Sequence, residues 1–229
     1  MTEWGTIYLS IRVALVATLA ILPLGILTAY GLARNKLRPV FLFENLIQLP
    51  LVLPPVVTGF FLLFLLSPDG FLGRPLALLG LTVPFTQTAA SLAAAIVAFP
   101  LMVQPVRVAF EQIDPEWEEA GYVYGGTRWT VFRMVTLPLA GRGVAAGIIL
   151  AFARALGEFG ATIVLAGNIP GVSRTIPLAI FTELNRLEGQ GMAIRLALVA
   201  VGISVASLAA YALLTRKLYK HDKPESGSW

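Results

Sequence analysis

Five long apolar stretches alternate with short polar segments along the chain. Each stretch has about 20 residues or more, which is the length that an α-helix needs to cross the ~30 Å hydrocarbon core of a bilayer. This pattern predicts an all-α fold, a polytopic bundle of about five membrane-spanning helices that forms a single domain over residues 1–229. The predicted spans are residues 8–33, 44–66, 87–110, 143–167 and 193–215.

The second span and one shorter apolar segment depart from a simple crossing helix. Residues 49–59 (LPLVLPPVVTG) hold three prolines, which membrane helices tolerate where neighbouring groups satisfy the freed backbone. This run fits a broken helix that lines a pathway, and equally a kinked packing helix. Residues 176–184 are too short to cross, so we expect an interfacial or gate-lining helix there, or a sixth crossing if the segment inserts more deeply.

The composition supports a membrane protein and removes several kinds of site. Hydrophobic residues make up 57% of the chain and charged residues only 13%, whereas soluble domains carry about a quarter charged residues. Cysteine is absent, so the chain cannot form disulfides or thiolate metal sites. His221 is the single histidine, which is too few for a His-based metal centre or catalytic triad. We expect no metal, no cofactor and no nucleic-acid partner.

The placement of Lys and Arg predicts the orientation in the membrane. If the N-terminus is outside, 11 of these residues flank the cytoplasmic ends of the spans, 5 lie on the outer side, and Arg154 falls within the bilayer. Cytoplasmic loops carry an excess of Lys and Arg, so the N-terminus is predicted outside and the C-terminus inside. Residues 13–33 are too long for the apolar region of a signal peptide and are interpreted as part of the first span.

Residues 114–126 carry the start and stop signals of a short helix in the second cytoplasmic loop. Asp114 suits the N-cap and Pro115 suits the first helical position. Gly125 supplies the left-handed residue that ends a helix. The predicted helix covers residues 115–124 and is about 15 Å long.

One face of this short helix is predicted to be a contact surface. Trp117, Ala120, Gly121 and Tyr124 are spaced at i, i+3, i+4 and i+7, so two small residues lie between two large ones and a partner can approach the backbone. The alternative is a helix lying in the lipid headgroups. The acidic residues of its first turn disfavour that alternative because anionic lipid would repel them.

A pair of charges falls inside the fourth predicted span. Arg154 and Glu158 are four residues apart, near mid-bilayer, where a charge costs at least ~2.5–3.5 kcal/mol on insertion scales. Three interpretations stay open. Arg154 could be a transient cationic binding site for a passing oxyanion, the pair could form a gate or a dimer contact, or the pair could be an ion pair that only orients helices. Gly157 and Gly160 nearby permit close helix packing.

Several segments resemble a known transporter family. Residues 119–138 resemble the "EAA" loop of bacterial ABC importer permeases, with Gly121 in place of the second alanine and Val135 in place of the usual isoleucine. Residues 49–59, 98–107 (AFPLMVQPVR) and 152–180 (FARALGEFGATIVLAGNIPGVSRTIPLAI) resemble permease subunits of molybdate ABC importers. Sulfate/thiosulfate and tungstate permeases are similar to a lesser degree.

The resemblance implies a fold and an assembly. The fold would be the transmembrane domain of a type I ABC importer. The chain would pair with a second copy of itself, bind two cytoplasmic ATPase subunits and receive oxyanion from an extracytoplasmic binding protein. The implied ATPase-coupling residues are Trp117, Glu119, Ala120, Gly121, Tyr124, Gly125, Leu137 and Pro138.

The predicted function is therefore the permease subunit of an ATP-driven molybdate importer, in the cytoplasmic membrane of a bacterium or archaeon. The chain holds no G-x-x-x-x-G-K-[ST] phosphate-binding motif, so ATP hydrolysis is expected in a separate subunit and not in this chain. Tungstate and sulfate/thiosulfate remain alternative cargoes. A passive anion channel is the alternative of another class, and the cassette at 119–138 argues against it.

Overall fold

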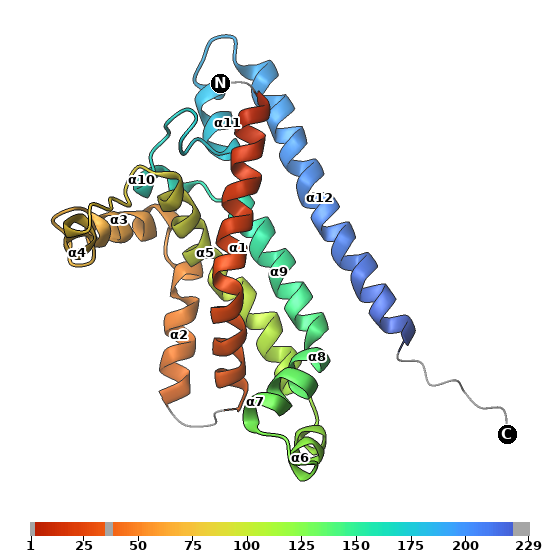
Figure 1. The fold of residues 1–229 in the computed structure, drawn as a ribbon. Coiled ribbons are helices and arrows are strands. Elements are labelled where there is room, and N and C mark those ends of the chain that lie inside the picture. The colour runs from red at the N-terminus through yellow and green to blue at the C-terminus, as the bar shows by residue number, and fades with distance from the viewer. Residues whose placement is uncertain (1–2, 35–38, 222–229) are drawn as a thin grey trace.

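The computed structural model describes residues 3–34 and 39–221, and over these residues all regular structure is helical, as the apolar pattern predicts. The centre of the bundle is formed by α1 (Glu3–Arg34), α5 (Gln87–Glu111) and α9 (Gly141–Leu156), which pack along one another (Figure 1). The beginning of α1 and α11 (Ile176–Leu184) lie at one end of the bundle, and α6 (Pro115–Val123) lies at the opposite end.

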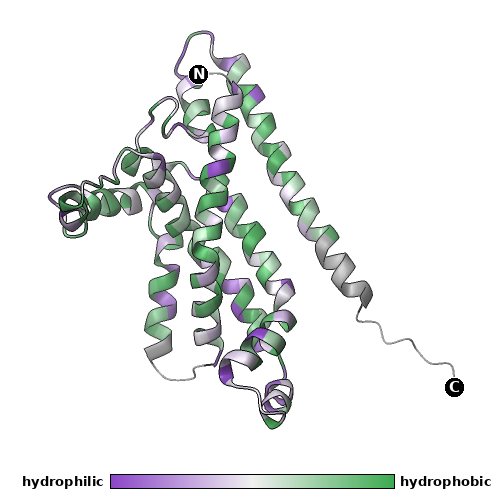
Figure 2. Ribbon diagram, viewed as in Figure 1, coloured by the Kyte–Doolittle hydropathy of each residue, from purple (hydrophilic) through white to green (hydrophobic). Residues whose placement is uncertain are grey.

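Three of the five predicted spans are single long helices. The span at 8–33 falls within α1, the span at 87–110 within α5, and the span at 193–215 within α12 (Gln190–His221). All three are long and apolar enough to cross a membrane, and the number of crossing helices rises to five if each bent pair counts as one. Figure 2 shows that apolar residues cover most of their length.

The span predicted over 44–66 is not a single helix. The segment divides into α2 (Pro39–Val52) and α3 (Pro55–Leu66), whose axes differ by 109°. Pro54 has an extended backbone (φ −54°, ψ 131°), because the proline that follows it disfavours the helical conformation, and two consecutive prolines remove two amide donors. The expected break is thus confirmed. After it, α3 turns away from the axis of the bundle and leads to α4 (Gly73–Leu78) (Figure 1).

The span predicted at 143–167 is also interrupted. Helix α9 ends at Leu156, and α10 (Gly160–Leu165) begins after three residues that are not helical. Before α9, the chain passes through α7 (Arg128–Val131), a π-helical turn η1 (Phe132–Thr136) and α8 (Leu137–Leu139), and this segment meets α9 at 71°.

Small side chains let the central helices approach closely. The buried face of α5 is rich in alanine, and a Cβ added at Gly147 of α9 would lie 2.7 Å from the Met102 carbonyl oxygen. Close approach through small residues is the usual way in which membrane helices associate. A second buried cluster, toward α6, consists of Ala29, Val103, Val106, Phe110, Ile113, Phe132 and Ala140.

The segment 176–184 forms the nine-residue helix α11, which is too short to cross a bilayer, as expected. Its first amide, Ile176 N, donates to Ser10 Oγ of α1 at 2.7 Å, so α1 caps α11 from outside its own sequence. Close by, Glu3 of α1 pairs with Arg195 of α12 at 2.6 Å. These contacts join α11 and α12 to the beginning of α1.

Candidate functional site

The short helix α6 forms where the sequence predicts it. Asp114 Oδ1 accepts from Glu116 N at 3.0 Å, and Pro115 occupies the first helical position. The helix ends at Val123, one residue before the predicted end, and Gly125 follows with φ +83°. A backbone hydrogen bond of 3.0 Å from Gly126 N to the Gly121 carbonyl closes the turn.

The outer face of α6 consists of Trp117 and Ala120 and is continued by Tyr124, the C-cap residue of the helix. All three side chains are exposed, Trp117 at 62% and Tyr124 at 93%, although two of them are large aromatic residues. Glu119 is exposed as well. A short helix that presents aromatic side chains to its surroundings, at one end of the molecule, has the character of an interaction surface.

The assignment of Gly121 to that outer face is wrong. A Cβ at Gly121 would lie 3.0 Å from Val131 Cγ2 and 3.6 Å from Val135 Cγ2, so the residue faces α7 and η1 within the same chain. On a helical period of 3.6 residues Gly121 lies between Trp117 and Glu118, at the edge of the face, and the loop closes against that edge. The absence of a side chain here permits internal packing.

The inner face of α6 is anchored by Glu118, which the sequence analysis did not single out. Glu118 Oε1 lies 2.6 Å from Arg34 Nη2, at the end of α1, and accepts a 2.8 Å hydrogen bond from Thr136 Oγ1 in η1. Three segments distant in sequence therefore converge on one carboxylate. A sequence pattern within one segment cannot predict this contact, because Arg34 and Glu118 are 84 residues apart.

Aromatic rings fix η1 against the same end of α1. The ring of Tyr30 lies edge-on to Phe110 and Phe132, with centroids 5.4 and 4.8 Å apart, and Trp129 stacks on Phe132 at 5.6 Å. Such pairs contribute about 0.5–1.5 kcal/mol each beyond the area that they bury. With the Glu118 bridge, they attach α6, α7 and η1 to the end of α1.

The end of the cassette turns the chain into α9. Leu137 is half-buried against the cluster that contains Phe132 and Ala140, whereas Pro138 is exposed. Leu137 and Pro138 therefore lie at the junction between the α6–α8 segment and α9, on different sides of it. Trp117 and Tyr124 are exposed on α6, so Leu137 is not part of their surface.

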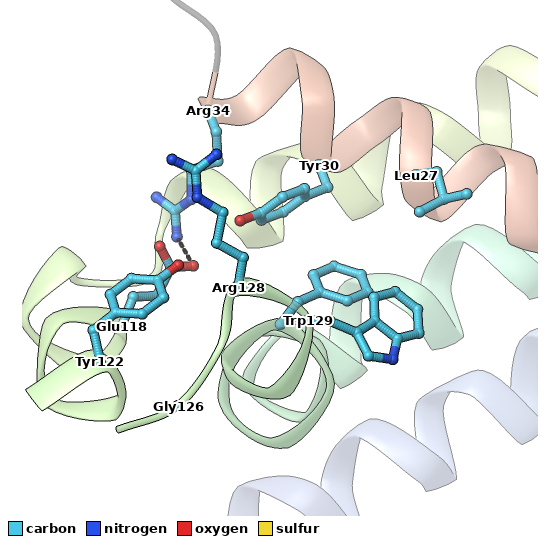
Figure 3. Close-up of a pocket in the computed structure, with 9 residues that line it drawn as sticks. Leu27, Tyr30, Arg34, Glu118, Tyr122, Gly126, Arg128 and Trp129 are labelled. Atoms are coloured by element: carbon cyan, nitrogen blue, oxygen red, sulfur yellow. Dashed lines mark hydrogen bonds and ion pairs between the residues drawn. The ribbon is translucent and has the colours of Figure 1, made fainter. Parts of the chain in front are cut away.

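A cleft opens between the last turns of α1 and the α6–α7 segment. Its volume is about 940 Å³, and Figure 3 shows its walls. Basic and aromatic side chains dominate the lining, with one acid among them. The lining residues are Leu27, Tyr30, Arg34, Glu118, Tyr122, Gly126, Arg128, Trp129 and Phe132.

Arg154 and Glu158 form the predicted ion pair, with Arg154 Nη2 2.7 Å from Glu158 Oε2. Their setting differs from the prediction, because Glu158 lies in the break after α9 and not on the same helix face. Its other oxygen accepts from Ala161 N at 2.8 Å, in the first turn of α10. Glu158 is 2% exposed, so one buried carboxylate ties the end of α9 to the start of α10.

The two broken segments meet at their breaks. A Cβ at Gly160 would lie 2.8 Å from Pro55 Cβ, and one at Gly59 would lie 2.7 Å from the Ala161 carbonyl oxygen. Helices α3 and α10 therefore pack backbone to backbone beside the Arg154–Glu158 pair. In the part of the chain that the structure describes, no group of three or more His, Cys, Asp or Glu could hold a metal ion.

The chain is similar to known membrane components of transport systems. Residues 21–220 match the family described as "Binding-protein-dependent transport system inner membrane component". The "Molybdenum transport system permease protein ModB" of Escherichia coli (strain K12) is 44% identical over 207 residues, which cover 90% of each chain. The protein of the same name from Haemophilus influenzae is 42% identical over 219 residues, 95% of this chain and 96% of that one.

A third relative and one solved structure widen the comparison. The "Sulfate transport system permease protein CysT" of Escherichia coli (strain K12) is 38% identical over 164 residues, 72% of this chain and 59% of that protein. The fold is shared with a bacterial ABC transporter involved in the import of the acidic polysaccharide alginate. That similarity has a TM-score of 0.69 at 18% identity and covers 97% of this chain and 82% of that one.

Proposed function

Because this chain belongs to the family of inner-membrane components of binding-protein-dependent transport systems, we propose that it forms the membrane pathway of a molybdate importer. The family makes it a multi-pass membrane protein and not itself the ATPase. The proposed assembly contains two copies of this chain, two cytoplasmic ATPase subunits that supply the energy, and an extracytoplasmic protein that delivers the oxyanion.

The cargo is proposed from the relatives. The two molybdenum permeases compared above are 42–44% identical to this chain over at least 90% of its length, whereas the sulfate permease is 38% identical over 72% of it. Molybdate, tungstate and sulfate are all tetrahedral dianions, so the decisive measurement is competition. We expect uptake of labelled molybdate to be inhibited by excess unlabelled molybdate and not by equal sulfate. Stronger inhibition by sulfate than by molybdate would overturn the assignment of molybdate as the cargo.

The observation that carries the motor-coupling role is the outer face of α6. It exposes Trp117 and Tyr124 on a helix that is braced internally through Glu118 to Arg34 and Thr136. Force applied to that face is transmitted to α1 and to the start of α9 as a rigid-body movement. Each chain has one such cassette, so a homodimer supplies one docking helix for each of two ATPase subunits.

The proposed orientation puts α6 in the cytoplasm, with the N-terminus outside and the C-terminus inside. Helix α6 lies at the end of the bundle opposite α11 and the beginning of α1 (Figure 1). The excess of Lys and Arg toward the α6 side supports this orientation. A cysteine introduced at exposed Thr130 should then react with a membrane-impermeant maleimide only after cells are opened, a measurement free of background because the chain has no native cysteine.

We assign Arg154 and Glu158 to the pathway or its gate. Their ion pair lies beside the junction of α3 and α10, where the backbone of two segments departs from helix. Interrupted membrane helices commonly line transport sites. Arg154→Ala is expected to lower transport or dimer assembly substantially, and a variant normal in both would contradict the assignment.

The docking assignment is tested at Gly125, whose φ of +83° favours glycine and which has open space around it. Gly125→Asp is expected to abolish co-purification of the ATPase while membrane insertion continues. Gly80→Asp is the matched control, because Gly80 also has a positive φ (+73°) and no neighbour within 4 Å, but lies after α4. ATPase retained by Gly125→Asp would refute docking at α6. Molybdate flux through the dimer alone in liposomes would instead favour a passive channel.

A further inference from the structure

The cleft between α1 and the α6–α7 segment holds an uncompensated positive charge. Arg34 is paired with Glu118 at 2.6 Å. Within the part of the chain whose side chains are described, Arg128 makes no ion pair, and its side chain reaches across the cleft toward Arg34, with the Tyr30 hydroxyl pointing to the same place (Figure 3). The lining thus carries two guanidinium groups and one carboxylate, a net charge of about +1, which suits an anion.

The other wall of the cleft is apolar and continues along α1. Leu27 lines the cleft, and Pro23 and Leu19, which follow it at four-residue intervals along the same row of α1, one and two turns further from Arg34, are also exposed. Trp129, which lines the same cleft as Leu27, is 63% exposed and stacks on Phe132. Tryptophan next to arginine, at the end of an exposed apolar strip, is the arrangement typical of the headgroup level of a membrane.

We propose that this cleft binds the headgroup of an anionic phospholipid. The phosphodiester would face Arg128 and the Tyr30 hydroxyl, and an acyl chain would lie along the exposed leucines of α1. Basic pockets between membrane helices bind such headgroups. A free phosphate ion would use the basic groups but leave the apolar strip of α1 unused.

The acids of α6 do not oppose this assignment. Glu118 is already neutralised by Arg34, and Glu116 and Glu119 are exposed and do not line the cleft. A lipid in this position would contact α1 and α7 together. It would therefore strengthen the attachment of the α6 segment to the membrane-spanning part of the chain.

Native mass spectrometry of the detergent-purified full chain tests the proposal. The protein is incubated with phosphatidylglycerol or with phosphatidylcholine, and bound lipid is counted. We expect retention of phosphatidylglycerol over phosphatidylcholine, and a roughly fivefold loss of that retention in Arg128→Gln, the effect of one cation near an anionic lipid surface. Arg128→Lys, which keeps the charge, is expected to retain most of the binding.

Arg133→Gln is the matched control, because Arg133 is exposed on the neighbouring η1 turn and does not line the cleft. Equal losses in Arg128→Gln and Arg133→Gln would overturn the proposal in favour of general surface charge. Displacement of the lipid by millimolar inorganic phosphate would overturn it in favour of a small-anion site. Unchanged lipid binding with loss of ATPase co-purification in Arg128→Gln would assign Arg128 to the motor contact instead.

Discussion

Replacing Glu158 separates two contributions that its carboxylate makes at the break between α9 and α10. One oxygen accepts from Ala161 N at 2.8 Å, and the other lies 2.7 Å from Arg154 Nη2. Glutamine keeps an oxygen that can accept from the amide but removes the charge, whereas alanine removes both. The difference between Glu158→Gln and Glu158→Ala therefore isolates the hydrogen bond to α10.

The magnitudes follow from the burial of the two partners. The side chain of Glu158 is 2% exposed and that of Arg154 is 27% exposed. Breaking a buried ion pair costs roughly 3–5 kcal/mol, and breaking an exposed one about 0–1 kcal/mol. Because Arg154 is not fully enclosed, we expect Glu158→Gln to lower the free energy of unfolding by about 2 kcal/mol. The unsatisfied Ala161 amide adds about 1–2 kcal/mol in Glu158→Ala.

The assay is a reversible denaturant titration of the full chain in detergent micelles. Arg154→Met and the Arg154→Met/Glu158→Gln double variant complete a double-mutant cycle, for which we expect a coupling energy of about 1–2 kcal/mol. Strictly additive single losses would refute a direct interaction between the two charges. Equal losses in Glu158→Gln and Glu158→Ala would refute the hydrogen bond to α10.

Two further substitutions test contacts between distant segments. Gly160→Ala is expected to cost about 1–3 kcal/mol in the same titration, because its Cβ would lie 2.8 Å from Pro55 Cβ; Gly157→Ala, with no neighbour nearer than 3.7 Å, is the tolerated control. Ser10→Ala removes the acceptor of Ile176 N, at a cost of about 1–2 kcal/mol. Hydrogen exchange at that amide should then accelerate about 5–30-fold, and an unchanged rate would mean that α11 is capped by another group.

The sequence predicts α6 well because the signals that define it are local. Asp114 and Pro115 begin the helix and Gly125 ends it, all within the segment itself. The same holds for the long helices α1, α5 and α12, whose apolar character extends over more than the thickness of a bilayer. Hydropathy measures how much of a segment is apolar, and for these elements that suffices.

The breaks and the internal contacts depend on residues far away in the chain. From the sequence alone, Gly160 fits an uninterrupted packing helix as well as a helix break. In the structure it contacts Pro55, more than 100 residues earlier, at the break. The Arg34–Glu118 bridge joins residues 84 positions apart. Gly121 looks like part of an open surface until α7 and η1 fold against it. Sequence patterns therefore located the candidate surface but not what braces it.

The order in which the helices meet has a consequence for synthesis of the protein. Helix α1 packs mainly against α5 and α9, which come later in the chain, so at roughly 5–20 residues per second it waits several seconds for α5 to follow it. During that interval the hydroxyls of Ser10 and Thr18, which are buried in the finished fold, lack the helices that later cover them. Both donate to carbonyls of their own helix, Thr6 O at 2.9 Å and Ala14 O at 2.8 Å, so the nascent helix can rest in the bilayer with these donors satisfied before any partner arrives.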